Sequence, residues 1–173
     1  MLKSTVLSVY IALCFTLSSY SLFAQSVATT ETAPSVITAK NKATALQTYA
    51  LFNDRKLEDL SKLYAEDYVS HTNSKIKGRE GVISDFTKNY KYWPDVKVII
   101  EQIVAEGDWV MIRSMTTATH SNVVMGVQPT QKTVEVVYWD VQHYNKEGLI
   151  FESWTMLDNA SLMQQLGLLP AKK

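Results

Sequence analysis

The stretch YWDVQHYNKEGLIFESW, residues 138–154, predicts two β-strands joined by a turn. Aromatic and β-branched residues fill both arms, and the connecting NKEG contains the only glycine. Asp140 lies inside the first arm, between Trp139 and Val141. A carboxylate in such a strand either faces water, with little consequence, or points into a pocket, where it can do chemistry. The direction of Asp140 therefore decides how the protein works.

Outward from this hairpin, the hydrophobic period divides the chain into a helical half and a strand half. Pro94 marks the boundary, because apolar residues follow helical spacing before it and Val and Ile dominate after it. We predict helices at residues 38–53, 55–68 and 78–90, strands at 95–106, 107–121, 133–144 and 149–157, and a short helix or packed apolar segment at 159–170. Helices followed by consecutive antiparallel strands give an α+β class, and a twisted sheet of this size can curl around the helices and leave a cavity.

The composition fits one globular domain. The chain has 173 residues, 46% of them hydrophobic, and a formal net charge of zero. A dedicated nucleic-acid binder normally shows a basic excess, so we expect no nucleic acid as partner.

The N-terminus has the layout of a secretory signal peptide. Lys3 precedes the apolar run VLSVYIALCFTL, and Ala24 is a suitable small residue before a cleavage site. We predict a signal peptide at 1–24, a flexible Ser/Thr/Ala-rich linker at 25–37, and a folded domain at 38–173. The protein would then be secreted or periplasmic and meet the membrane only through the transient signal. An uncleaved N-terminal anchor is the alternative.

The single cysteine, Cys14, lies in the predicted signal. The mature chain would then have no cysteine nucleophile, no disulfide and no cysteine-based zinc site. The three histidines lack metal-ligand spacing, so we expect neither a metal nor another cofactor.

Several strings occur together in a recognisable order. They are VAEGDWV, GVQPTQKTVEV, WDVQHYNKEGLIFESW and QQLGLLP, and the likeness extends over residues 41–170. The set resembles the SnoaL-like polyketide cyclases, within the nuclear transport factor 2-like superfamily. The resemblance implies a conical α+β barrel, in which a curved antiparallel sheet wraps around N-terminal helices and encloses an apolar pocket. It also implies a homodimer through the outer sheet face. Members include aldol and ester cyclases, isomerases and hydrolases, and others only bind ligands, so the fold does not settle the function.

The resemblance also implies a catalytic pair. In the cyclases an aspartate on the third long strand is the acid–base group and a histidine on the preceding strand assists it, which matches Asp140 and His120. Strand alternation places Asp140 with Val136 and Tyr138, and an apolar surrounding would raise its pKa toward neutrality. The alternative is an Asp140 that forms a salt bridge or faces water. His143 stands where the family often has arginine, which leaves the substrate open. Strand alternation places it on the face opposite Asp140, so we expect it at the surface or in an interface.

Aromatic residues are candidates for the pocket wall. We assign Tyr68, Tyr138, Trp93 and Trp154 to it. Relatives often have a histidine at the pocket mouth where this chain has His71, which is otherwise a loop residue without a role.

Taken together, the sequence predicts an exported protein that binds a small apolar or semi-polar organic molecule. With Asp140 as proton shuttle it would be a cofactor-free enzyme of the aldol-cyclase, isomerase or hydrolase type. The alternative is a non-catalytic ligand-binding or dimerisation module of the same fold.

Overall fold

The computed structural model describes residues 35–72 and 76–170, all of which belong to one unit of the chain. The predicted signal peptide and nearly all of the predicted linker lie outside the described residues. The folded chain begins slightly earlier than expected, because Ser35 caps the first helix through its side chain, which accepts a hydrogen bond from the Thr38 amide at 3.2 Å. Within the described residues, no helix combines the length and the apolar character that a membrane span requires.

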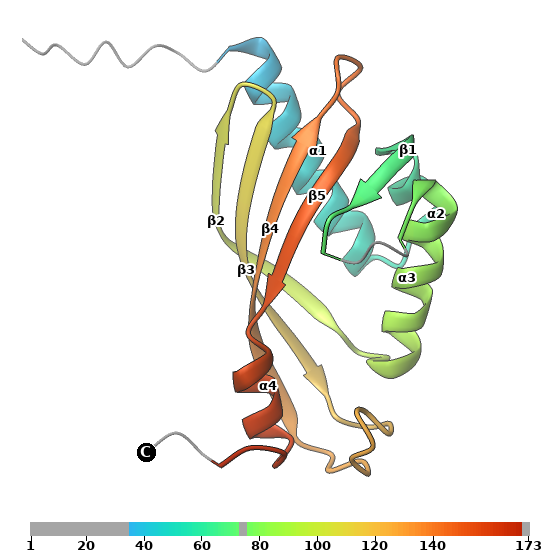
Figure 1. The fold of residues 1–173 in the computed structure, drawn as a ribbon, viewed down its shortest axis with the longest axis vertical. Coiled ribbons are helices and arrows are strands. Elements are labelled where there is room, and N and C mark those ends of the chain that lie inside the picture. The colour runs from blue at the N-terminus through green and yellow to red at the C-terminus, as the bar shows by residue number, and fades with distance from the viewer. Residues whose placement is uncertain (1–34, 73–75, 171–173) are drawn as a thin grey trace, which may run out of the picture. The chain divides into compact units, whose positions relative to one another are not determined.

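The described residues form helices and one β-sheet, as shown in Figure 1. The elements are α1 Val36–Asn53, α2 Leu57–Ser61, β1 Tyr64–Ser70, α3 Gly78–Tyr92, β2 Lys97–Glu106, β3 Trp109–Thr119, β4 Thr133–Tyr144, β5 Ile150–Leu157 and α4 Asn159–Gln165. The five strands follow the order β1-β5-β4-β3-β2, with β1 parallel to β5 and every other pair antiparallel. The predicted α+β class and the four consecutive antiparallel strands are confirmed.

The fifth strand corrects the predicted second helix. That helix was expected over residues 55–68, but α2 ends at Ser61 and β1 follows from Tyr64. Tyr64 and Tyr68 are four residues apart, so they share a face in a strand as well as in a helix, and the spacing alone does not separate the two. Here both tyrosines are buried and their rings meet edge to face at 4.9 Å. The sheet is therefore mixed rather than purely antiparallel.

A β-bulge in β5 reverses the alternation of that strand. Tyr144 pairs with Ile150 and His143 pairs with Glu152, so Phe151 is an extra residue without a partner of its own. Beyond the bulge, Ser153 is buried and Trp154 is 36% exposed. Plain alternation from Ile150 would place Trp154 on the inner face, and the bulge moves it to the outer one.

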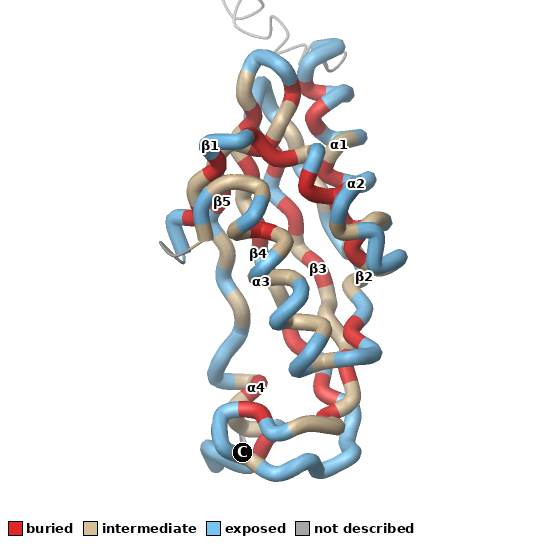
Figure 2. Tube along the Cα trace, turned by 90° about the vertical axis from the view of Figure 1, so that its right-hand side faces the viewer, coloured by how far each residue is buried: buried red, intermediate tan, exposed pale blue. Residues whose placement is uncertain are grey.

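The inner face of the sheet faces the helices. Helix α1 contacts β2 and β3, α3 contacts β1, and α4 closes against β4 (Figures 1 and 2). Buried and exposed residues alternate along the first part of β4, with Val134 and Val136 inside. The opposite face leaves large apolar side chains exposed, and we call it the outer apolar face: Ile99, Val104, Trp109, Met111, Trp139, Trp154 and Met156.

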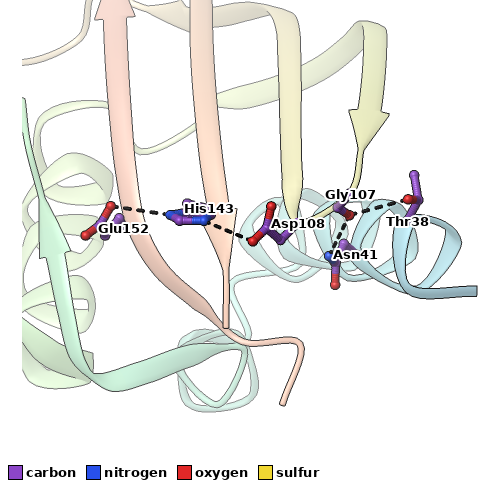
Figure 3. Close-up of polar contacts among 6 residues, drawn as sticks. All are labelled: Thr38, Asn41, Gly107, Asp108, His143 and Glu152. Atoms are coloured by element: carbon purple, nitrogen blue, oxygen red, sulfur yellow. Dashed lines mark hydrogen bonds and ion pairs between the residues drawn. The ribbon is translucent and has the colours of Figure 1, made fainter. Parts of the chain in front are cut away.

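Polar contacts fix the start of α1 against the β2–β3 turn. The carbonyl of Gly107 accepts hydrogen bonds from the Thr38 hydroxyl at 3.4 Å and from the Asn41 side-chain amide at 3.3 Å (Figure 3). Both side chains are buried, so these bonds satisfy polar groups that would otherwise be costly to bury. The first helix is thereby held along the inner side of the sheet.

Candidate functional site

A cavity of about 360 Å³ lies between the inner sheet face and the helices. This volume suits a small organic molecule. Aromatic and aliphatic side chains dominate its wall, and three of the residues proposed for a pocket wall, Tyr68, Tyr138 and Trp93, lie in its lining. The lining residues are Thr48, Tyr49, Phe52, Tyr64, Tyr68, Ser70, Ile76, Val82, Asp85, Phe86, Asn89, Trp93, Val96, Val98, Thr116, Ala118, Val134, Val136, Tyr138, Asp140, Ser153, Thr155, Leu157 and Leu162.

Asp140 lines this cavity and is only 7% exposed. Its Oδ2 accepts hydrogen bonds from Gln142 Nε2 at 2.7 Å and from the Tyr49 hydroxyl at 3.3 Å. Its Oδ1 is buried and has no hydrogen-bond partner among the described residues. A buried carboxylate oxygen without a donor is unfavourable, so this atom lacks the hydrogen bond that a buried acceptor normally has.

The environment of Asp140 makes it a stronger base than an ordinary carboxylate. Burial raises the pKa of Asp140 to about 6, although the hydrogen bonds from Gln142 and Tyr49 each lower it. A carboxyl group with this pKa is largely ionised at pH 7 and can both take up and return a proton near neutrality.

A hydrogen-bond chain along β4 orients Asp140. The Tyr144 hydroxyl donates to Gln142 Oε1 at 2.6 Å, and Gln142 in turn donates to Asp140. Gln142 and Tyr144 are each 1% exposed. Because Gln142 Oε1 accepts the hydrogen bond from the Tyr144 hydroxyl, the Nε2 atom of Gln142 must be the one that faces Asp140.

His120 lies elsewhere. Asp140 pairs across the sheet with Ile112, whereas the residue before His120, Thr119, pairs with Thr133. The seven positions from Thr133 to Asp140 correspond to roughly 23 Å along β4. The expected contact between His120 and Asp140 is therefore not formed.

Although remote from Asp140, His120 is fully buried and has an incomplete set of hydrogen bonds. Its Nδ1 lies 3.0 Å from the Thr130 hydroxyl, and its Nε2 has no partner among the described residues. Its ring centroid lies 5.9 Å from that of Trp93, which lines the cavity, whereas His120 is not a lining residue.

His71 and Trp154 lie on the outer side of the sheet and not in the cavity lining, which corrects their assignment to the pocket wall. Their rings stack with centroids 4.3 Å apart and planes 6° apart. The bulge at Phe151 explains why Trp154 lies on the outer face. His71 follows the end of β1, and its ring stacks on that of Trp154. His71 Nε2 also lies 3.7 Å from Glu152 Oε2.

His143 also lies on the outer side, as the alternation of β4 predicted. Its Nε2 is 3.2 Å from Asp108 Oδ2, and its Nδ1 is 3.5 Å from Glu152 Oε2 (Figure 3). Its ring stacks on Trp109 with centroids 3.9 Å apart. These contacts hold His143 away from Asp140 and from the cavity.

Among the polar residues of the site that did not emerge from the sequence are Tyr49, Asp85, Asn89 and Gln142. Gln142 had a signal, because it stands two residues after Asp140 on the same strand face. Asp85 and Asn89 had a weaker sequence signal: they are four residues apart, which places them on one face of α3 beside its apolar stripe. Tyr49 had none, since its contact with Asp140 joins α1 to β4.

Comparison with known proteins places these features in a family. Residues 43–166 match the SnoaL-like polyketide cyclase family. IdmH from Streptomyces antibioticus, a candidate polyketide cyclase, is 31% identical with a TM-score of 0.67, over 73% of this chain and 98% of its own. AclR from Streptomyces galilaeus, a candidate hydroxylase, is 28% identical with a TM-score of 0.70, over 79% of this chain and 86% of its own. No curated protein matches the chain.

Proposed function

Because the chain belongs to the SnoaL-like polyketide cyclase family, we propose that it binds a small apolar or semi-polar organic molecule in the cavity and that Asp140 exchanges protons with it, without a cofactor. One observation carries this proposal. Asp140 is buried in the cavity wall; Gln142 and Tyr49 hold one of its oxygens, and the other, Oδ1, has no hydrogen-bond partner in the described part of the chain. Such a carboxylate has a fixed orientation and a free basic atom, which is what proton abstraction needs.

The chemistry follows from the arrangement. Oδ1 of ionised Asp140 takes a proton from a carbon next to a ligand carbonyl, and the C–H electrons move onto the carbonyl as an enolate. Burial raises the pKa of Tyr138, so this cavity phenol stays protonated and can donate a hydrogen bond. In aldol cyclisation the enolate then attacks a second carbonyl, and the resulting alkoxide takes the proton back from Asp140. In isomerisation Asp140 returns the proton to a different carbon of the enolate.

Proton abstraction can be tested without the natural substrate. 2-Tetralone, a cyclic ketone that stays neutral at pH 7, should exchange its α C–H in D₂O faster with the protein, as followed by proton NMR, and the rate should rise as pH passes through about 6. Asp140→Asn should remove the acceleration. The exposed Asp67→Asn is the matched control and should keep it. Equal acceleration by wild type and Asp140→Asn would disprove the role of Asp140.

A non-catalytic binding module is the second candidate, and the position of His120 favours it. The assisting histidine expected beside Asp140 is absent from the cavity lining. If a ligand that stabilises the fold is recovered unchanged after long incubation, and the protein does not accelerate exchange of the ketone, this candidate replaces the enzyme.

We also propose that two copies of the chain pair through the outer apolar face. Trp139 is 38% exposed, Met111 46% and Val104 66%, on neighbouring strands of one surface, and a patch of this kind marks an interaction site. Met111→Lys should shift sedimentation toward the monomer. Val36→Lys, at the start of α1 and 86% exposed, should not.

Export remains our proposal for residues 1–24. The charge and apolar run described above support it. Cell fractionation should find the shortened chain outside the cytoplasm, and replacing the apolar run with polar residues should retain it inside.

A further inference from the structure

The helix wall of the cavity has polar groups of its own. Asp85 and Asn89 lie four residues apart on α3, so they share one face of the helix, and both line the cavity. Asn89 Oδ1 is buried and has no hydrogen-bond partner among the described residues. On the sheet wall, Asp140 Oδ1 is in the same state, in a side chain that is 7% exposed. Two lining residues, one on α3 and one on the sheet, thus each have a buried oxygen without a hydrogen-bond partner among the described residues.

The charges around the cavity have one sign. Asp85 and Asp140 are both lining residues, and the described lining contains no lysine, arginine or histidine. Burial raises the pKa of Asp85, and the positive charge of Lys88 lowers it by a smaller amount. Lys88 itself is exposed. Both carboxylates also raise the pKa of Tyr68 and Tyr138, after the larger effect of burial, so they act on the same pair of phenols.

We propose that Asp85 and Asn89 form an acceptor pair across the cavity from Asp140, and that this pair selects a neutral hydroxylated ring compound over its carboxylate analogue. The proposal rests on the proposed binding of a ligand in this cavity. Hydroxyl groups on the ligand would supply the donors that the buried oxygens lack. A ligand carboxylate would bring a third negative charge into a poorly solvated space that offers no cation.

A matched pair of probes separates these effects. The probes are 1,5-dihydroxynaphthalene and 5-hydroxy-1-naphthoate, which share the ring and differ by a carboxylate in place of one hydroxyl. Binding is measured by calorimetry at pH 7, where the hydroxyls stay protonated. We expect the wild type to bind the diol at least roughly tenfold more tightly than the naphthoate.

Variants on α3 assign the preference to the helix wall. Asp85→Asn should weaken diol binding and strengthen naphthoate binding, so that the preference falls by roughly tenfold. Asn89→Leu should weaken the diol more than the naphthoate, since it removes an acceptor without changing charge. Asp67→Asn removes the same charge from an exposed site on β1 and should leave both affinities unchanged. Thermal unfolding verifies that each variant is folded.

The possible results are distinct. A wild-type preference that narrows in Asp85→Asn but not in Asp67→Asn supports the acceptor pair. Equal binding of the two probes, or a preference that Asp85→Asn and Asn89→Leu both leave unchanged, overturns it while ligand binding in the cavity stands. If neither probe binds, the proposed binding of ring compounds fails, and the acceptor pair fails with it.

Discussion

Gln142 Nε2 lies 2.7 Å from Asp140 Oδ2, and both side chains project from the same face of β4. The bond occupies one carboxylate oxygen, and the other has no hydrogen-bond partner among the described residues. Tyr144 holds the far end of the same amide, so the amide cannot turn around without losing both bonds. The orientation of the candidate catalytic group is thus set within one strand, by residues at positions 140, 142 and 144.

Removing the Gln142 amide should raise the pKa of Asp140 further above about 6, because that hydrogen bond stabilises the ionised form. We expect Gln142→Leu to move the carboxyl titration, followed by carbon NMR, to higher pH. Tyr49→Phe should move it in the same direction by less, since its bond is longer at 3.3 Å.

Gln102→Leu is the control for this titration. Gln102 lies on β2 and accepts a hydrogen bond from Arg113 at 3.0 Å, away from the cavity lining. The Asp140 titration should not change in this variant. A pKa of Asp140 that stays the same in Gln142→Leu would mean that burial alone controls it.

The raised pKa of Asp140 also predicts how stability depends on pH. Between about 4 and about 6 the folded protein retains a proton that the unfolded chain has lost, so this group favours folding at low pH and the benefit is lost as the pH rises through this window. Asp140→Asn should therefore be more stable than wild type above pH 7, by up to about 3 kcal/mol, and nearly equal at pH 4. Urea unfolding at both pH values measures the difference.

Asp95→Asn should show the opposite dependence. Hydrogen bonds from Thr119, including its backbone amide at 2.9 Å, lower the pKa of Asp95, so ionised Asp95 stabilises the fold above its unfolded pKa and that contribution disappears as acid protonates it. This variant should lose stability at pH 7 and little at low pH. If the stability of both variants changes in the same direction with pH, the replacement of Asp by Asn controls the result, and the surroundings of each carboxyl do not.

The regular strand was the predictable part of the site. Alternation along β4 assigned Asp140, Tyr138 and Val136 to one face and His143 to the other, and the structure agrees. It did so because β4 pairs with β3 without a register shift. Where strand pairing is regular, alternate residues lie on the same face of the sheet, so the face can be predicted from the sequence.

The errors occur where the ladder is irregular or where contacts are long-range. The extra residue Phe151 has no composition signal, and it reverses the face of Trp154. His120 was matched to the family histidine by its position in the resembling strings, and the register of β3 against β4 places it far from Asp140. The Tyr49 contact joins residues 91 apart in sequence, and no local pattern encodes such a pairing.

Asn53 at the end of α1 acts as a substitute strand partner for β2. Its Nδ2 donates to the Val98 carbonyl at 2.8 Å, and its Oδ1 accepts from the Val98 amide at 2.9 Å. Asn53→Ala should cost about 2 kcal/mol, because it leaves both groups of Val98 without this partner. Asn53→Asp should retain only the bond from the amide. Urea unfolding that found Asn53→Ala as stable as wild type would show that water replaces the side chain.

Gly78, the first residue of α3, should tolerate no side chain. Its φ is +63°, and an added Cβ would lie 2.7 Å from the backbone carbonyl oxygen of Glu66. Gly107→Ala provides the comparison, since Gly107 has φ +57° but open space around its Cβ position. Gly107→Ala should cost about 1 kcal/mol for the backbone conformation alone, and Gly78→Ala should cost about 2 kcal/mol more in urea unfolding. Equal losses would mean that α3 moves away from β1 to accept the methyl group. Because α3 carries Asp85 and Asn89, the same displacement would also alter the affinity for the dihydroxynaphthalene probe.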